Sequence, residues 1–132
     1  MEVQKEVEII LTRQLASYLA TPAFLVDPRG TLLFYNEPAE VLLGQRFEET
    51  GELSVEAWGT RFEPTGADGV PLPVESLPLV MALRTRHPAH GEFWITSADG
   101  QRRHLLLTAM PLAGQAGRFL GALALLWEGP GK

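Results

Sequence analysis

Three histidines are the residues of this chain best suited to acid–base or metal chemistry, and their spacing supports neither. His87 and His90 follow the end of a predicted helix, and His104 follows two arginines at the start of a predicted strand. Histidine near a helix C-terminus commonly interacts favourably with the helix dipole. None of the three has the H-x-x-E or H-E-x-x-H spacing that gathers metal ligands. We therefore expect no metal site.

Nucleophilic and carboxylate chemistry also lack the partners they need. The chain has no cysteine, which excludes thiolate nucleophiles, disulfides and cysteine-ligated metals. Its candidate serines have neither a neighbouring base nor a G-x-S-x-G elbow: Ser54, Ser76 and Ser97. The acidic run of Glu48, Glu49 and Glu52 is more simply a solvated loop than an acid–base pair. We expect no enzymatic activity, and a small α+β enzyme with Asp27 as its base is the least favoured alternative.

Length and charge narrow the class of protein further. A chain of 132 residues is most simply one domain with a hydrophobic core of its own, and 45% of its residues are apolar. Its net charge of −5 leaves no basic face for phosphate groups, so we expect no direct nucleic-acid binding. No apolar run reaches the ~18 residues of a membrane span, and the N-terminus lacks a signal-peptide pattern. The expected location is the cytoplasm, with no membrane contact.

The N-terminal segment, residues 1–20, predicts an amphipathic helix that stands apart from the rest of the domain. Its apolar residues recur mostly at spacings of three and four, opposite Glu, Gln, Lys and Arg. The helix is expected to end before Pro22, because the residue before a proline avoids the helical region. The apolar stripe must be buried on the domain or on a second copy, and we expect a homodimer. The interface candidates are Val3, Val7, Ile10, Leu11, Leu15 and Tyr18.

A sharp turn and two helix signals follow within twenty residues. Asp27, Pro28 and Gly30 match the first, second and fourth positions of a type I turn. Two short apolar runs flank this turn and predict a hairpin, residues 23–26 and 31–35. Asn36 is placed to cap the next helix, and Gly44 is placed to end that helix in the left-handed conformation. We expect these residues to have structural roles.

The second half predicts a long irregular loop, one more helix and three strands. Gly and Pro interrupt residues 45–75, leaving at most a helical turn within 53–58. Ser76 is expected to cap a helix that ends before Pro88. The predicted strands are 91–97, 103–111 and 118–127. The last two strands are apolar on both sides, so the central helices should cover one face of the sheet. The N-terminal helix or a second subunit should cover the other, in an α+β fold with a five-stranded antiparallel sheet.

A set of short motifs runs along nearly the whole chain in a definite order. The motifs are Pro22-Ala23-Phe24-Leu25-Val26-Asp27, Gly30, Asn36-Glu37-Pro38-Ala39, Leu43-Gly44, Asp68-Gly69, Pro78, Ala98-Asp99-Gly100, Met110-Pro111-Leu112 and Gly121-Ala122. Each is unspecific alone, but the ordered set spans about residues 17–128 and resembles the PAS (Per-Arnt-Sim) sensor family. The resemblance implies a PAS-like (profilin-like) sheet in the order 2-1-5-4-3, with helices on one face enclosing a pocket. It places the sensor domain at residues 21–128 and a tail at 129–132.

The resemblance also implies a function in signal transduction. Domains of this family sense a small molecule, light or redox state, or bind no ligand, and they pass the result to an output domain or partner. A kinase or a transcription regulator is a partner of this kind, and dimer contacts made by flanking helices commonly carry the signal. The alternative function is a ligand-free dimerisation module. The C-terminal residues Trp127 to Lys132 lack the Asp-Ile-Thr-like motif that often leads to an output helix.

The resemblance leaves the ligand unknown but excludes one cofactor chemistry. Family members with flavin–cysteine photochemistry need a cysteine, which this chain lacks. Haem-binding members use a histidine on the helix facing the sheet, and His87 lies only at the end of that helix, which disfavours haem. A ligand of this fold should be apolar or amphipathic and lie in a mainly hydrophobic pocket. The pocket candidates, whose faces depend on strand register, are Phe24, Phe34, Leu42, Leu79, Leu83, Trp94, Leu106 and Leu123.

Overall fold

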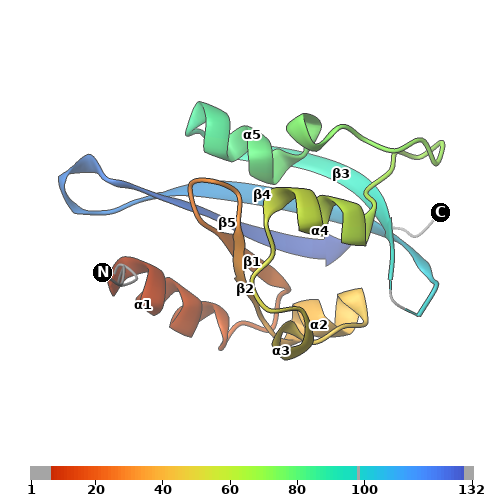
Figure 1. Cartoon of the computed structure of the whole chain (residues 1–132), viewed down its shortest axis with the longest axis horizontal. Coiled ribbons are helices and arrows are strands. Elements are labelled where there is room, and N and C mark those ends of the chain that lie inside the picture. The colour runs from red at the N-terminus through yellow and green to blue at the C-terminus, as the bar shows by residue number, and fades with distance from the viewer. Residues whose placement is uncertain (1–6, 98, 130–132) are drawn as a thin grey trace.

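The computed structural model describes residues 7–97 and 99–129, with helices packed on both faces of one sheet (Figure 1). The helices are α1 (Val7–Ala16), α2 (Glu37–Leu43), α3 (Phe47–Thr50), α4 (Val55–Phe62) and α5 (Pro78–Thr85), with short 3-10 helices η1 (Val74–Ser76) and η2 (Gln115–Gly117). The strands are β1 (Ala23–Val26), β2 (Leu32–Tyr35), β3 (Ala89–Thr96), β4 (Arg102–Ala113) and β5 (Phe119–Glu128). No described helix is long and apolar enough to cross a membrane.

The five strands form one antiparallel sheet in the order β2-β1-β5-β4-β3. The first strand therefore lies between the second and the last, so the first and last strands of the chain pair with each other. β4 and β5 form a long hairpin that extends beyond the other strands (Figure 1). The predicted α+β class and the predicted strand order are both confirmed.

Helices α2, α4 and α5 cover one face of the sheet, which we call the inner face. Alternate strand residues point into the main core between sheet and helices, such as Phe24 and Val26 in β1 and Leu105 and Leu107 in β4. This alternation is the period of two that a β-strand imposes on its side chains. The inner face therefore holds the largest cluster of buried apolar side chains.

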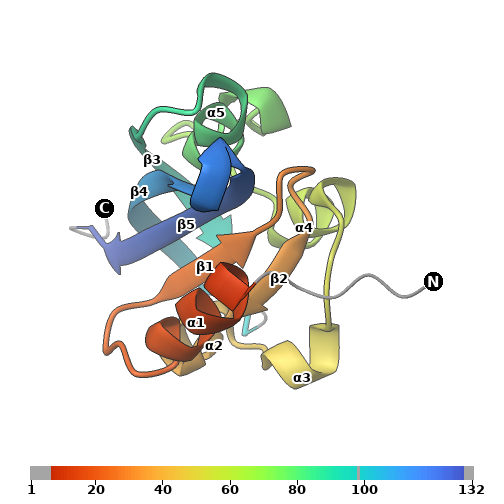
Figure 2. The ribbon, with the colours of Figure 1, turned by 90° about the vertical axis from the view of Figure 1, so that its left-hand side faces the viewer.

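Helix α1 covers part of the opposite face, which we call the outer face. Ile9 of α1 packs on Leu25, Leu33 and Leu120 in a second, smaller core. Figure 2 shows α1 lying alongside β1 and β2. The expectation that the N-terminal helix helps to cover the second face of the sheet is met in this part of the sheet.

Strand β2 contains one residue more than the part of β1 opposite it, because the pairing register shifts within the strand. The extra residue is Leu33. A bulge of this kind breaks the regular alternation of side chains between the two faces. Leu33 and Phe34 therefore both pack in the outer core, whereas Leu32 and Tyr35 face the inner core.

The buried side chain of Asn36 joins three elements. Its Oδ1 accepts hydrogen bonds from the backbone N–H groups of Ala23 in β1 (3.0 Å) and Ala39 in α2 (3.2 Å). Its Nδ2 donates to the carbonyl oxygens of Ala16, at the end of α1, and Thr21 (both 2.9 Å). A primary amide offers two donor hydrogens and an acceptor oxygen, and all are used here. Asn36 therefore caps α2 and also ties α1 to the sheet.

The turn between β1 and β2 is held by its own short side chains. The Gly30 N–H donates to the Asp27 carbonyl (2.9 Å), and Asp27 Oδ1 accepts from the backbone N–H groups of Arg29 and Thr31. Gly30 has a φ of +90°, a conformation that glycine adopts without steric cost. The chain reversal is thus stabilised by hydrogen bonds within the turn itself.

The N-terminal helix is shorter than its apolar pattern predicts. It ends at Ala16, and the following N–H of Leu19 closes a tighter turn by donating to the Ala16 carbonyl (3.1 Å). The side chain of Asn36 also donates a hydrogen bond to the Ala16 carbonyl, which leaves this carbonyl less available for a hydrogen bond that would continue the helix. The predicted continuation of the helix to residue 20 is therefore wrong at its C-terminal end.

The segment 45–75 is more regular than its Gly and Pro content predicts. It contains α3, α4 and η1, and Ser54 caps α4 by accepting a hydrogen bond from the Ala57 N–H (3.2 Å). Ser76 does not cap α5, because its hydroxyl donates back to the Pro73 carbonyl (2.7 Å) and Leu77 occupies the cap position. Tertiary packing of α4 on the inner core outweighs the weak local preference.

Candidate functional site

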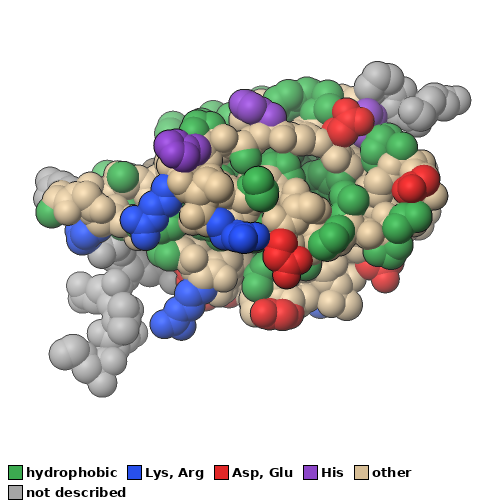
Figure 3. All heavy atoms as spheres, turned by 90° about the horizontal axis from the view of Figure 1, so that it is seen from above, with side chains coloured by type: hydrophobic (Ala, Val, Ile, Leu, Met, Phe, Trp, Pro, Cys, Tyr) green, Lys and Arg blue, Asp and Glu red, His purple; other side chains and the backbone are tan. Residues whose placement is uncertain are grey.

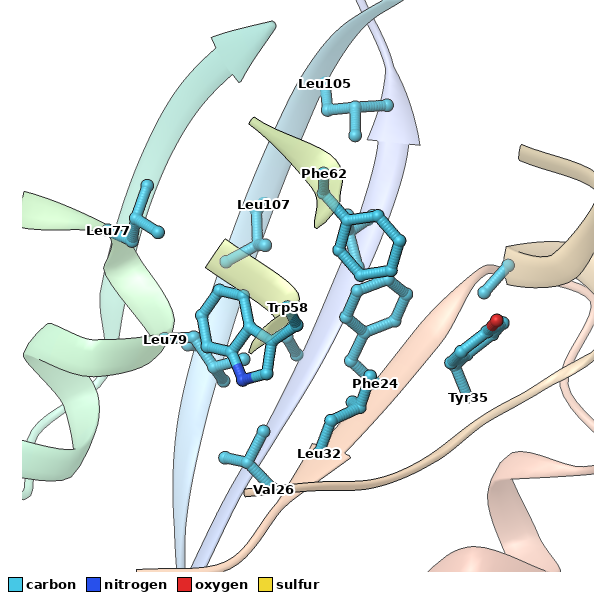
Figure 4. Packing of buried hydrophobic residues seen from close by; sticks show 14 of the residues in the cluster. Phe24, Val26, Leu32, Tyr35, Trp58, Phe62, Leu77, Leu79, Leu105 and Leu107 are labelled. Atoms are coloured by element: carbon cyan, nitrogen blue, oxygen red, sulfur yellow. The ribbon is translucent and has the colours of Figure 1, made fainter. Parts of the chain in front are cut away.

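The inner core contains a small, partly open cavity between the sheet and helices α4 and α5. Its volume is about 30 Å³, and its walls include the aromatic rings of Phe24, Trp58, Phe62 and Phe93. Figure 4 shows Phe24 and Phe62 side by side, with Trp58 facing the same region from α4. The cavity lies between the sheet and the helices, where the family resemblance implied a ligand pocket.

The walls of this cavity are apolar throughout. The indole N–H of Trp58 is already used, since it donates to the Gly30 carbonyl at 2.8 Å. Ligand pockets generally pair an apolar lining with a few polar groups and have volumes of about 300–1,000 Å³. A cavity of about 30 Å³ holds roughly one or two waters. In this conformation the inner core is thus essentially filled by its own side chains.

Tyr35 lies beside the cavity and connects the inner core to the edge of the sheet. Its hydroxyl donates to the Gln45 carbonyl (3.0 Å), and its ring lies 5.5 Å from that of Phe24 and 5.4 Å from that of Phe47. Burial raises the pKa of the Tyr35 phenol above its usual value of 10.0, because the phenolate would lose its hydration. The folded state therefore holds the phenolic proton more tightly than the unfolded chain does.

We expect this raised pKa to make the protein lose stability at alkaline pH. The contribution of Tyr35 is fully present below pH 10 and is lost as pH rises through the higher pKa of the folded state. Denaturant unfolding of the wild type and of Tyr35→Phe across this range measures the effect. Tyr35→Phe should show a shallower decline of stability with pH than the wild type. Equal slopes in the two proteins would contradict the prediction.

The exposed side of α1 is the second candidate site. Its apolar side chains point away from the protein's own sheet, with exposed fractions of 49–83% for Val7, Ile10, Leu11, Leu15 and Tyr18. Of the described α1 residues, only Ile9 and Ala16 are buried. Val3, the remaining interface candidate, lies outside the described residues. The helix thus packs on its own sheet through a few residues and presents its larger apolar side to solvent.

Polar and aromatic contacts hold α1 in this orientation. The Arg13 guanidinium lies over the ring of Phe34 (4.6 Å to the centroid) and near that of Phe47 (5.6 Å). Glu8 forms an ion pair with Arg118 at the tip of the β4–β5 hairpin (3.3 Å). Cation–π contacts of this kind contribute about 0.5–1 kcal/mol at exposed sites. With the Asn36 hydrogen bond to Ala16, these contacts determine which side of α1 faces outward.

Known structures share this architecture at low sequence identity. The PAS domain of a protein from Colwellia psychrerythraea is 17% identical, covering 90% of this chain and 96% of that one, with a TM-score of 0.57. The Rhodobacter sphaeroides LOV protein is 16% identical, covering 93% and 68%, with a TM-score of 0.64. The PAS domain of nitrogen regulation protein NR(II) from Vibrio parahaemolyticus is 18% identical, covering 89% and 97%, with a TM-score of 0.61.

The match with these structures extends over nearly the whole chain, and the strand order is the one that the sequence resemblance implies. The chain has the PAS fold. No model of a known protein family matches this sequence, and no curated protein is significantly similar to it. The relationship to these structures is therefore one of fold.

Within this PAS fold, the predicted pocket residues divide between the two faces of the sheet. Phe24 and Leu79 line the cavity, and Leu42 belongs to the inner core without lining the cavity. Leu83 packs partly on the inner core and lines an open groove outside α5. The other four candidates lie on the outer face and cannot line this cavity: Phe34, Trp94, Leu106 and Leu123.

Strand register explains these four corrections. The bulge at Leu33 carries Phe34 to the outer face, although simple alternation from Leu32 would point it inward. The other three are one residue out of phase with inward-facing neighbours, and a shift of one residue changes the face. The cavity residues missed from the sequence lie mainly on strands β3, β4 and β5 and on α4. Trp58 and Phe62 are four residues apart, a spacing that places two side chains on one face of a helix. This spacing is the signal in the sequence from which these two α4 residues could have been predicted.

The histidines of this domain do not converge. His87 and His90 lie away from the core, beyond the end of α5 and on β3 respectively. His104 is buried on the outer face and stacks on Trp94, with 4.2 Å between ring centroids. Across the described residues, no group of three His, Cys, Asp or Glu side chains is arranged to hold a metal ion.

Proposed function

We propose that this PAS domain is a regulatory module of signal transduction that acts through a homodimer formed by the exposed side of α1. The observation that carries the proposal is the concentration of exposed apolar residues. Nine large apolar side chains are exposed in the described part of the chain, and five of them belong to α1 and the turn after it. Isolated exposed apolar residues are ordinary, but a contiguous patch is typical of an interaction surface.

The arrangement of these residues suits a second helix as the partner. Val7 and Leu11 are four residues apart and so lie along one line of the helix, with Ile10 and Leu15 on either side, and Tyr18 is exposed in the turn after the helix. A second copy offers the same stripe, so a two-fold pair of α1 helices would bury both. The polar contacts of Glu8 and Arg13 lie on the other side of the helix and would remain intact.

The known structures with this fold support a regulatory role. One of them is the PAS domain of a protein named for nitrogen regulation. By analogy of fold, we propose that this domain influences an output domain or a separate partner, such as a kinase or a transcription regulator, through its dimer contacts. Catalysis has no part in the proposal.

The cavity favours dimerisation over small-molecule sensing as the primary role. A cavity of about 30 Å³ would have to enlarge about tenfold to hold a typical ligand. Enlarging it would separate rings that now pack closely, such as Phe24 and Phe62, whose centroids are 6.4 Å apart. Small-molecule binding in the inner core is therefore the second candidate function, and it requires a conformation with a looser core.

The experiment that tests the proposal places charges in the α1 stripe. Val7→Glu combined with Leu11→Glu should weaken the dimer at least about 100-fold, because carboxylates would be buried in an apolar interface. Sedimentation equilibrium and light scattering measure the change. Val41→Glu, at a similarly exposed apolar position on α2, should leave the dimer intact. A wild-type protein that is monomeric at about 100 μM, or a charged variant that still dimerises, would refute the proposal.

A further inference from the structure

An open groove runs along the surface between α4, η1, α5 and the β1–β2 turn. Its volume is about 340 Å³, about ten times that of the inner cavity. Its apolar floor consists of Val55, Val74, Val80 and Leu83. Figure 3 shows the side of the molecule that carries α5, with apolar side chains over the middle and basic ones toward the hairpin end. The groove is thus large enough for a side chain or short segment from another molecule.

The floor of the groove is half-buried by its own domain. On α5, Leu79 and Ala82 are buried in the inner core, whereas Val80 and Leu83 are partly exposed on the groove side. These two residues are three apart, so they form one face of the helix. An occupant would cover branched apolar side chains that already face each other across the groove, with no change in the fold.

Three charged side chains line this groove, Arg29, Glu56 and Glu75, and Arg84 follows the lining residue Leu83 on α5. Arg29, Arg84, Glu56 and Glu75 make no side-chain hydrogen bond or ion pair with the described residues. Arg84 lies one turn along α5 from Val80 and so on the same side of the helix. Other arginines of the domain are engaged, as Arg118 is with Glu8. Charges of both signs that the described domain does not use therefore flank an apolar groove.

We propose that this groove is a docking site for a short segment of a partner protein. The segment inserts one large apolar side chain over Val80 and Leu83. It carries an acidic residue toward Arg29 and Arg84 and a basic residue toward Glu56 and Glu75. Recognition of this kind combines an apolar anchor in a pocket with a polar rim that determines orientation.

The mixture of charges selects a peptide over other anionic partners. A nucleic acid or an anionic lipid surface would be attracted by Arg29 and Arg84 but repelled by Glu56 and Glu75. The net charge of −5 opposes both partners over longer distances as well. Only a partner with both signs of charge satisfies all four side chains. A peptide segment provides both within a few residues.

This site is separate from the proposed dimer interface. The groove lies on the helices that cover the inner face, whereas α1 lies on the outer face of the sheet. A dimer formed through α1 would leave the groove open, so each copy could hold one segment. The two proposals can therefore fail independently.

Selection from a random library of displayed 12-residue peptides, with the full chain immobilised, tests the docking site. We expect the selected peptides to share an apolar residue flanked by an acidic and a basic one. Val80→Glu should weaken their binding at least tenfold, while Met81→Glu, on the neighbouring exposed position of α5, should change it less than twofold. Circular dichroism and thermal unfolding establish that both variants are folded.

A charge reversal provides the decisive arm of the experiment. Arg29→Glu combined with Arg84→Glu should change the preferred flanking residue from acidic to basic in a new selection. The proposal is overturned if no sequence is enriched, if the enriched peptides bind Val80→Glu as tightly as the wild type, or if charge reversal leaves the preference unchanged. Titration of the α1 variant Leu11→Glu with the same peptides should give wild-type affinity, since α1 lies on the other face.

Discussion

Replacing Asn36 with alanine is expected to lower the free energy of unfolding by about 3–4 kcal/mol. The variant loses four hydrogen bonds, and it leaves buried backbone groups of Ala23, Ala39 and Ala16 without that partner. Each neutral hydrogen bond contributes about 0.5–1.5 kcal/mol, and each buried group left unpaired costs about 1–3 kcal/mol. The expected loss of stability is smaller than the sum of these contributions, because water can reach part of the α1–β1 connection and pair with some of the backbone groups. Urea unfolding of wild type and variant measures the difference.

A second effect of the same substitution should appear in α1 before global unfolding. The Asn36 Nδ2 contacts to Ala16 and Thr21 tie the end of the helix to the sheet, so their loss should speed hydrogen exchange of the α1 amides. Ser54→Ala is the matched control, because it removes a single exposed cap from α4 and should cost only about 1 kcal/mol. If Asn36→Ala lowers the free energy of unfolding no more than Ser54→Ala does, Asn36 acts only as an ordinary helix cap.

Gly121→Ala should be at least as damaging, through a clash with the backbone. A Cβ at this position would lie 2.0 Å from the carbonyl oxygen of Val26, the last β1 residue that pairs with β5. Gly121 also has a φ of +129°, which residues with a side chain rarely adopt. Neither problem can be relieved by rotating a side chain, so β1 must move away from β5. We expect a loss of at least about 3 kcal/mol and a lower yield of folded protein.

The control variant, Gly100→Ala, distinguishes the cost of backbone strain from the cost of a steric clash. Gly100 has a φ of +84°, and a Cβ added there would have no neighbour within 4 Å, so Gly100→Ala experiences only conformational strain. It should cost about 1–2 kcal/mol. Thermal unfolding monitored by circular dichroism compares the two variants, and limited proteolysis detects separation of β1. Equal losses in both variants would mean that the approach of Val26 has no energetic consequence.

The packing of α1 connects its exposed surface to the inner core. The helix is held by a few contacts, with Ile9 as its main buried anchor and Arg13 lying over Phe34 and Phe47. Phe47 in turn contacts the ring of Tyr35, which lies beside Phe24 at the cavity wall. A chain of aromatic contacts around the edge strand β2 thus connects the α1 surface to the inner core.

Elements with local causes can be read from the amino-acid sequence alone. Asp27 and Gly30 form their turn, and Asn36 and Gly44 bound α2, through interactions that span at most four residues. The ordered motifs also led to the correct strand order, because they resemble a known family. The apolar stripe of α1 is visible in the sequence as well, since helical periodicity needs no tertiary contact.

The side of each element that is buried depends instead on contacts between distant parts of the chain. Phe34 lies on the outer face because of one inserted residue in β2, and Leu106 lies there because Leu105 and Leu107 point inward. Both assignments depend on register with a neighbouring strand, and a change of one residue reverses them. The outward direction of the α1 stripe depends likewise on contacts with distant residues such as Phe34 and Arg118. Periodicity specifies that two faces differ, and only long-range packing specifies which of them is buried.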